Sequence, residues 1–183
     1  MQPDRKVPAR ALLLPPRKWM EGSAMRFIRE YVKDGMTVLD MGSGPGFFTL
    51  EIARRVGPKG LVYAVDADEN SINLLKRTIE SQSINNVIPV LASVDRMDFI
   101  DDDSMDIVFS NKTLCCVRRH LDAVGEIKRV LKHEGVAYVS ISRPALDAIS
   151  VNSREWAIIL SMFRIIKQGA SLTSRWAILA LQQ

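Results

Sequence analysis

The stretch from Val38 to Asp68 reads VLDMGSGPGFFTLEIARRVGPKGLVYAVDAD, and it decides the fold. Its first residues form a short apolar run that is typical of a buried strand. A turn with glycines at positions 42, 44 and 46 follows, and then the pattern of a helix over residues 47–56. A second strand, residues 60–65, leads to Asp66. This order predicts a βαβ unit with a ligand-binding turn at its first corner.

The same alternation of strands and helices continues along the chain. Helices are expected over residues 20–31, 70–81, 121–131 and 153–161, and further strands over residues 87–91, 106–110, 136–141, 163–167 and 175–181. The last two strands are joined by a short connection and predict a hairpin, so one of them runs antiparallel to the rest. We therefore expect an α/β fold, a doubly wound and mostly parallel sheet of seven strands with helices on both faces.

The glycine spacing narrows the class of ligand. A dinucleotide fold has G-x-G-x-x-G, whose third glycine would fall on Phe47, and no Gly-Lys-Ser/Thr sequence of a phosphate-binding loop is present. Asp40 precedes the turn, where it would repel a pyrophosphate but hold an ammonium group. Asp66, 20 residues after Gly46, can accept two hydrogen bonds from ribose hydroxyls. These residues predict a pocket for an adenosine that carries a cationic amino-acid tail.

Length and composition are those of one globular domain. The chain has 183 residues, of which 47% are hydrophobic and 25% charged. No apolar run reaches the ~18 residues that a membrane span needs. Cys115 and Cys116 are adjacent and cannot staple a fold, which fits a reducing compartment. Two isolated histidines and one cysteine pair do not make the spaced ligand set that zinc prefers. We therefore expect a cytoplasmic protein without a metal site.

Positive charge is concentrated at the amino terminus. Residues 1–33 carry eight Lys and Arg against three Asp and Glu, whereas the rest of the chain carries 17 against 18. Residues 1–19 also hold four of the eight prolines, so we treat them as a basic arm before a single domain of residues 20–183. Three hypotheses for the arm stay open: it binds nucleic acid, it is a solvated tail, or it is a lid over the pocket. In a lid, Arg17, Trp19 and Met20 would cap the pocket.

From residue 16 onwards the sequence resembles the class I S-adenosylmethionine-dependent methyltransferases, in particular the small ubiquinone/menaquinone C-methyltransferase-like group. VLDMGSGPG is similar to the first motif of that family and VYAVDAD to the second. DSMDIVFSNKTLCCV is similar to the fourth motif, and EIKRVLKHEGVAYVSIS to the helix and strand after it. The resemblance implies a sheet in the order 3-2-1-4-5-7-6 with strand 7 antiparallel, and S-adenosyl-L-methionine as the cofactor.

The resemblance also implies a role for residues at the ends of the first four strands. Asp40 would anchor the amino group of the cofactor, Asp66 would bind both ribose hydroxyls, and Asn111 would lie near the transferred methyl group. Relatives often have an acidic residue for the adenine amino group where this chain has Ser93, and Asp95 is the alternative. Further cofactor contacts are expected from Gly42, Ser43, Gly44, Gly46, Ala67, Asp68, Ser93 and Val94.

No catalytic constellation stands out in the sequence. A sulfonium methyl is already activated by its charge, so positioning of the nucleophile can supply ~7–11 kcal/mol without an acid or base. Asn111 and His120 are the remaining candidates for a direct role, and His120 is also readable as the first residue of a helix. Cys115 and Cys116 replace a histidine pair of many relatives. Because adjacent strand residues point to opposite faces, at most one cysteine is expected to face the pocket.

The sequence thus predicts a methyltransferase that acts on a small molecule by in-line displacement. An RNA or protein acceptor guided by the basic arm is the first alternative, and a cofactor-binding protein without turnover is the second. The residues 110–113, SNKT, lack the Asn/Asp-Pro-Pro-aromatic motif of amino methylases, which disfavours that chemistry. The acceptor, the methylated atom and the oligomeric state are not determined by these patterns.

Overall fold

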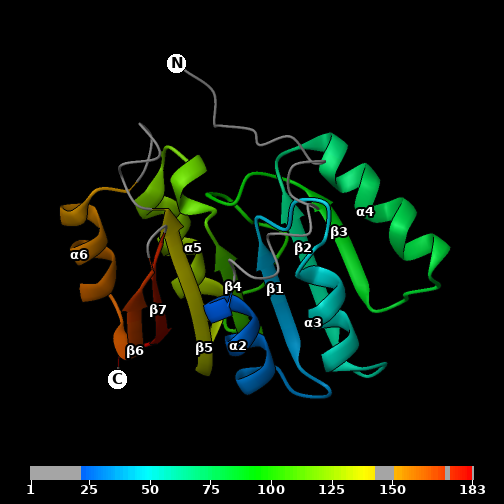
Figure 1. Cartoon of the computed structure of the whole chain (residues 1–183), viewed down its shortest axis with the longest axis horizontal. Helices are drawn as coiled ribbons and strands as arrows, with labels where there is room; N and C mark the ends of the chain where they lie inside the picture. Colours follow the sequence, from blue (N-terminus) through cyan, green and yellow to red (C-terminus); the bar gives the residue numbers. More distant parts are fainter. Residues whose placement is uncertain (1–21, 143–150, 172–173, 183) are drawn as a thin grey trace.

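The computed structural model describes residues 22–142, 151–171 and 174–182, which form one seven-stranded sheet in the order β3-β2-β1-β4-β5-β7-β6 (Figure 1). The first five strands are parallel neighbours, and β7 runs antiparallel to both β5 and β6. This arrangement confirms the expected strand order and the terminal hairpin. The strands are β1 Thr37–Met41, β2 Leu61–Asp66, β3 Val87–Leu91, β4 Met105–Asn111, β5 Leu131–Ser142, β6 Arg164–Ala170 and β7 Ser174–Ala180.

Helices cover both faces of the sheet, as a doubly wound fold requires. Among the described residues they are α2 Gly22–Tyr31, α3 Thr49–Val56, α4 Glu69–Ser81, α5 His120–Val130 and α6 Ser153–Ser161, together with the 3₁₀ turn η2 Leu114–Cys116. The apolar residues of α2, α3 and α4 join one core cluster, and those of α5 and α6 join the other. Figure 1 shows α2 and α3 in front of the sheet and α5 behind it.

Two expected boundaries are wrong in an informative way. The helix after the glycine turn begins at Thr49, not at residue 47, because Phe47 and Phe48 still belong to the turn. The strand expected at residue 136 already begins at Leu131, which pairs with Met105 before the register shifts. The polar residues 132–134 hide this early pairing, because a register shift breaks the two-residue alternation on which strand prediction depends.

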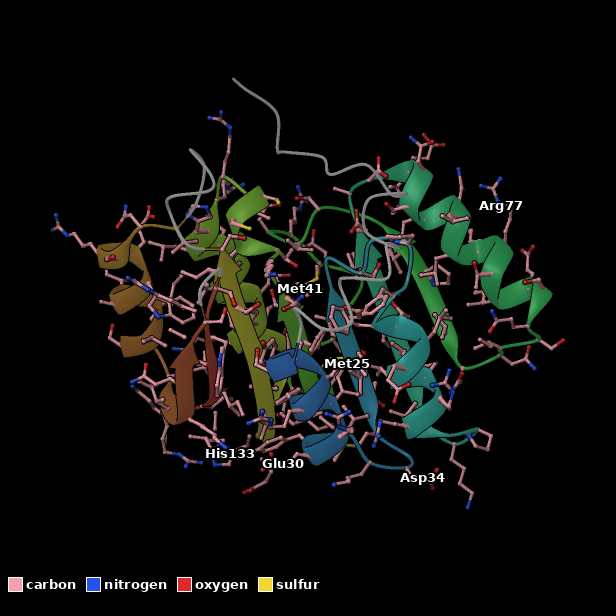
Figure 2. The ribbon with its side chains drawn as sticks, in the orientation of Figure 1. Met25, Glu30, Asp34, Met41, Arg77 and His133 are labelled. Carbon is pink, nitrogen blue, oxygen red and sulfur yellow. The ribbon has the colours of Figure 1, made fainter. Side chains whose placement is uncertain are left out.

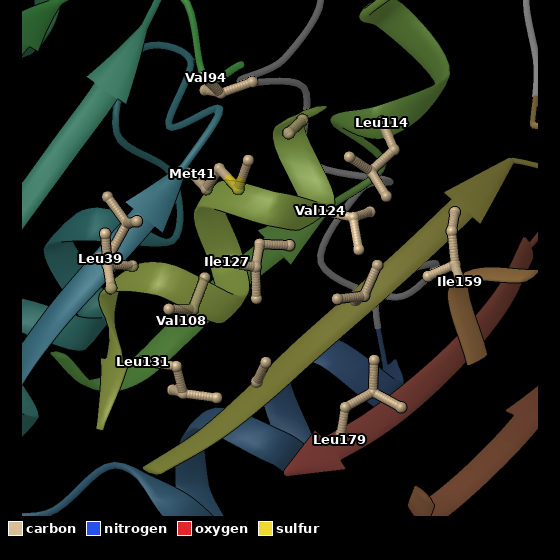
Figure 3. Packing of buried hydrophobic residues seen from close by; sticks show 14 of the residues in the cluster. Leu39, Met41, Val94, Val108, Leu114, Val124, Ile127, Leu131, Ile159 and Leu179 are labelled. Carbon is tan, nitrogen blue, oxygen red and sulfur yellow. The ribbon is translucent and has the colours of Figure 1, made fainter. Parts of the chain in front are cut away.

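The core is two apolar layers, one on each side of the sheet. Figure 3 shows one layer, in which Val124 and Ile127 of α5 lie over Leu39 and Val108 of the central strands. In the other layer, Phe27 of α2 stacks among the aromatic side chains of β4 and β5. Both layers hold the central strands rigidly, so the loops at their ends are presented from a fixed frame. No helix in the described part of the chain is long and apolar enough to cross a membrane.

Candidate functional site

The carboxyl ends of β1, β2, β4 and β5 meet at one edge of the sheet, at the top of Figure 1. In an open parallel sheet, ligands bind outside this edge, where neighbouring loops separate. Successive strands are added on one side of β1 up to β3 and on the other side from β4 onwards, so the topological switch point lies between β1 and β4. Met41, at the end of β1, marks the place in Figure 2. The glycine loop, residues 42–46, starts there.

The glycine loop is held in a shape that side chains would prevent. Gly42 has φ of +81° and Gly46 of +95°, a region that other residues rarely adopt. A Cβ at Gly42 would lie 2.2 Å from Oγ1 of Thr113, and one at Gly46 would lie 2.5 Å from Cδ1 of Leu75. The loop therefore packs its backbone directly against neighbouring elements. Backbone of this kind lets a ligand approach closely.

Asp66 ties this loop to the end of β2. Oδ2 of Asp66 accepts a hydrogen bond of 2.7 Å from the Gly44 N–H, and Oδ1 accepts one of 2.8 Å from the Asp68 N–H. A carboxylate has about four lone-pair positions, so it can accept hydroxyl donors as well as backbone N–H groups. The two backbone bonds fix the orientation of the carboxylate before any ligand arrives. The sequence predicts a role for Asp66 but not this bracing of the loop.

Asp40 is a buried carboxylate beneath the loop. Its side chain is only 2% exposed, and Oδ2 accepts a hydrogen bond of 2.5 Å from Oγ1 of Thr49. Burying a carboxylate is costly unless hydrogen bonds or a cation compensate it. Thr49 begins α3, so the first helical turn after the glycine loop supplies one of these bonds. A ligand ammonium group is the kind of partner that this environment favours.

The residues expected to contact the adenine differ in exposure and in their hydrogen-bond partners. Ala67 is exposed, whereas the side chain of Asp68 caps α4 by accepting from the Ser71 N–H at 2.9 Å. Ser93 donates its hydroxyl to Oδ1 of Asp95 at 2.5 Å, so the two candidates for the adenine amino group form one pair. The side chain of Val94 lies in the core cluster. Their contacts with a cofactor stay predictions.

Asn111 has a partner that sequence reasoning misses. Ser140 lies directly opposite on β5, and its hydroxyl donates to Oδ1 of Asn111 at 2.7 Å. Ser140 Oγ also accepts from the Lys112 N–H at 3.1 Å, while Lys112 takes a left-handed φ of +59°. Asn111 and Ser140 are both buried. A serine within an apolar strand is unremarkable in one sequence, and only the strand pairing makes it the neighbour of Asn111.

His120 agrees with the expected helix start, whereas the two cysteines differ from expectation. His120 begins α5, with Nδ1 3.8 Å from Oε1 of Glu155 on α6, so its reading as a helix N-terminal residue is confirmed. Cys115 and Cys116 lie in η2, not at a strand end, and their sulfur atoms are only 4.0 Å apart. The expectation that they point to opposite sides is therefore wrong. A 3₁₀ turn does not alternate side chains as a strand does.

The residues predicted to form the lid lie outside the described part of the chain. These are Arg17, Trp19 and Met20 of the basic arm, so the lid stays a prediction.

Within the described residues, no three His, Cys, Asp or Glu side chains are grouped as ligands for a metal ion. The acidic turn Asp101–Asp103 is exposed at the surface, as expected.

The arrangement fits the cofactor expected from the glycine spacing. The side chains of Thr113 and Leu75 occupy the places where a Cβ of Gly42 and of Gly46 would lie, so the loop keeps its close-packed shape only with glycine at these positions. Asp66 offers a preoriented carboxylate beside the loop, and Asp40 offers a buried one beneath it. An adenosine with a cationic tail needs these two carboxylates at opposite ends. Pyrophosphate would meet repulsion from both.

The chain is similar in sequence to methyltransferases. A family model described as a methyltransferase domain matches residues 32–175. A ribosomal protein L11 methyltransferase of Dictyoglomus turgidum is 31% identical over 134 residues, which cover 72% of this chain and 41% of that protein. A demethylmenaquinone methyltransferase of Geobacillus stearothermophilus is 29% identical over 130 residues, which cover 70% of this chain and 54% of that protein. The chain thus spans about half the length of these curated relatives, or less.

The fold is also found among solved structures. An S-adenosylmethionine-dependent methyltransferase from Aquifex aeolicus superposes with a TM-score of 0.72 at 23% identity. The match covers 94% of this chain and 93% of that one. At this identity the likeness shows the fold alone, and the family model carries the relationship.

Proposed function

Because the chain belongs to the class I S-adenosylmethionine-dependent methyltransferases, we propose that it transfers a methyl group to a small molecule held beside Asn111. The observation that carries this proposal is the convergence of three features at one sheet edge. These are the glycine loop after β1, the braced Asp66 after β2, and the Asn111–Ser140 pair across β4 and β5. S-adenosylmethionine, the cofactor of the family, supplies a methyl group on a positively charged sulfur.

In this proposal the protein binds and orients. Asp40 holds the cationic amino group, and Asp66 accepts hydrogen bonds from the two ribose hydroxyls. The glycine loop lies along the methionine and ribose portion, and Ala67, Ser93 and their neighbours lie along the adenine. Fixed hydrogen-bonding groups of this kind act without reorganising, which is the main source of rate enhancement in such sites.

Asn111 would orient the methyl acceptor. The Ser140 hydroxyl donates to Oδ1 of Asn111 and so helps to fix the orientation of the amide. We infer that the amide held in this way orients the acceptor near the methyl group. His120 would act only if the acceptor arrives protonated, as a base whose Nδ1 side faces Glu155.

Two considerations support a small acceptor. The connections at the carboxyl edge of the described part are short, the longest running from residue 92 to 104, so the described loops add no inserted subdomain to receive a large partner. A stable macromolecular interface takes roughly 800 Å² on each side. The chain also resembles the quinone C-methyltransferase-like group, and one of its relatives is a demethylmenaquinone methyltransferase. A planar aromatic acceptor is the finer form of the proposal.

A macromolecular acceptor is the second candidate. The excess positive charge of residues 1–33 favours RNA or an acidic protein surface, and one relative methylates a ribosomal protein by its name. If RNA is the acceptor, its binding weakens steeply as salt rises, because released counterions drive that association.

A methyl-transfer assay in cell extract, followed by fractionation, tests the proposal. The protein is incubated with extract and cofactor carrying a labelled methyl group, and small molecules, RNA and protein are then separated. Label in the small-molecule fraction, lost with the Asp66→Asn variant, is the expected result. Label in RNA or protein alone overturns the small-molecule proposal in favour of the alternative. Binding of the cofactor without label in any fraction supports a protein that does not turn over.

A further inference from the structure

The turn after β4 brings the only two thiols of the chain together. Cys115 and Cys116 belong to η2, and their Sγ atoms are 4.0 Å apart. Cys115 is buried and Cys116 is partly exposed, and neither forms a disulfide. The pair therefore has one sulfur in the protein interior and one that solvent can reach.

A backbone oxygen closes the third side of this pair. The carbonyl oxygen of Lys112 lies 2.8 Å from Sγ of Cys115 and 3.9 Å from Sγ of Cys116. Lys112 keeps an uncommon left-handed φ of +59°, while its N–H is held by the carbonyl and hydroxyl oxygens of Ser140 at 3.0 and 3.1 Å. The rigid sheet thus fixes the position of the oxygen against both thiols. Uncommon backbone conformations of this kind persist only where the surroundings enforce them.

We propose that Cys115 and Cys116 form a two-thiolate site for a soft, thiophilic metal ion of low coordination number, for which Cu(I) is the probe. Metal–thiolate bonds are about 2.3 Å long, and two that meet at the angle of about 120° of a three-coordinate ion place their sulfur atoms roughly 4.0 Å apart. The observed separation of 4.0 Å is close to this value. One ion can therefore contact both sulfur atoms with only a small adjustment of η2.

The composition of the site selects the class of ion. Zinc is bound by four ligands in structural sites, and the described residues offer no group of three His, Cys, Asp or Glu. Soft thiolates without carboxylates or imidazoles favour Cu(I). Binding releases the two thiol protons to solvent as two sulfur–copper bonds form, and neither the sulfur atoms nor the ion change oxidation state. The partly exposed Cys116 gives the ion its way in.

The site adjoins the glycine loop but is distinct from the two carboxylates assigned to the cofactor. Thr113, which precedes η2, donates its hydroxyl to the Met41 carbonyl at 2.7 Å and packs where Gly42 has no Cβ. Copper binding is therefore measurable without cofactor, acceptor or turnover. Failure of the methyltransferase proposal and failure of this one are distinguishable.

Competitive titration tests the site. The reduced full-length protein is titrated with Cu(I) under anaerobic conditions against a coloured Cu(I) chelator. One copper per chain is expected, with at least a 100-fold weaker affinity in Cys115→Ser and in Cys116→Ser. Ser142→Ala is the matched control, because its hydroxyl lies 3.7 Å from Sγ of Cys115 and is a hard donor that Cu(I) does not prefer. This control is expected to keep the parental affinity within about twofold.

Protection from alkylation gives a second readout that does not depend on the variants. In the copper-loaded parent, mass spectrometry should find the partly exposed Cys116 protected from iodoacetamide, and removal of copper should restore its reaction. Thermal unfolding of each variant shows whether it is folded. The proposal is overturned if a variant with both cysteines replaced by serine keeps its copper, if either single variant binds as the parent does, or if copper leaves Cys116 unprotected.

Discussion

At the scale of single residues, the candidate site depends on polar side chains that are already oriented. Asp66 binds two backbone N–H groups, Asp40 binds a helix-initiating threonine, and Asn111 is bound by Ser140. Each of these groups is fixed by a neighbour on a different element. The orientation therefore costs little when a ligand arrives.

The carboxylate of Asp66 should dominate the affinity for the cofactor. Hydrogen bonds to a charged group are worth about 1.5–3 kcal/mol each, and two ribose hydroxyls would make two of them. Asp66→Asn should therefore weaken binding of the demethylated cofactor by well over tenfold in titration calorimetry. Asp101→Asn, in an exposed turn, serves as the control and should bind as the parent does. Equal affinities for the two variants would show that Asp66 does not contact the ribose.

Ser140 and Ser110 form a natural pair of test and control. Both are buried serines near the ends of adjacent strands, but Oγ of Ser140 bonds Asn111 and Lys112, whereas Oγ of Ser110 has no hydrogen-bond partner among the described residues. Ser140→Ala should destabilise the protein by about 1–2 kcal/mol, because it strips a buried amide of its donor. Ser110→Ala should be neutral or slightly stabilising.

Urea unfolding measures both serine variants. For Ser140→Ala we also expect the rate of methyl transfer to fall at least fivefold while the cofactor affinity stays unchanged, since only the orientation of Asn111 is lost. An unaltered transfer rate in Ser140→Ala would argue that Asn111 does not orient the acceptor.

At the scale of elements, Arg129 of α5 holds the loop between β3 and β4 at several points. Arg129 donates to the carbonyl oxygens of Met97 and Ile100 at 3.0 and 2.7 Å, and to both oxygens of Glu126. Glu126 in turn accepts from the Met97 N–H at 2.6 Å. This network closes the loop that carries Ser93 and Asp95, so a helix on the far face positions the adenine side of the candidate site.

Removal of this arginine should loosen the loop. Arg129→Met leaves two loop carbonyls without their arginine donor and Glu126 without its ion-pair partner, and we expect a loss of about 2–3 kcal/mol in the free energy of unfolding. Arg96→Met is the matched control, because the Arg96–Asp98 pair is exposed and such pairs contribute little. Thermal unfolding checks the result. Equal melting temperatures for the two variants would show that the network does not hold the loop.

The same network predicts a dependence on pH. Hydrogen bonds from Arg129 hold the pKa of Glu126 below its ordinary value of 4.5. The stabilisation from Glu126 is therefore fully present above pH 4.5 and is lost as the pH falls through the lower value of the folded state. The difference in stability between the parent and Glu126→Gln should shrink below pH 4.5 and stay constant between pH 6 and 8. A difference that stays constant down to pH 3 would contradict this assignment.

At the scale of the whole molecule, the candidate site lies at one edge of a rigidly packed sheet. The parallel strands end together at the carboxyl edge, and the two apolar layers lock the sheet from both sides. The basic arm of residues 1–19 precedes α2 and remains a prediction from the sequence. A lid formed by this arm would add the acceptor side that the described loops do not supply.

Truncation separates the lid from a solvated tail. The lid hypothesis expects that deletion of residues 1–18, and separately Trp19→Ala, leaves the melting temperature within a few degrees. It also expects weaker cofactor binding or loss of turnover, because an open site admits water. Raised salt should slow the parent more than the truncated protein if the arm attracts an anionic acceptor. A truncated protein that binds and turns over as the parent does would leave only the solvated tail.

The sequence by itself determined the alternation of strands and helices and the terminal hairpin, and its resemblance to a known family implied the strand order and the cofactor. Short apolar strands, glycines at 42, 44 and 46, and Asp66 at a fixed distance are local patterns, and a parallel sheet leaves few ways to connect them. The terminal hairpin was equally readable, because its two strands are close along the chain. These features depend on hydrophobic period and backbone sterics, which act over a few residues.

Only the tertiary structure decided which side chains meet. Ser140 is 29 residues from Asn111, and Gly44 is bound by a carboxylate 22 residues away, so neither contact follows from local pattern. The joint orientation of Cys115 and Cys116 depends on a 3₁₀ turn that sequence reasoning took for a strand end. Such contacts depend on strand register and loop packing, which are set by the whole core and not by neighbouring residues.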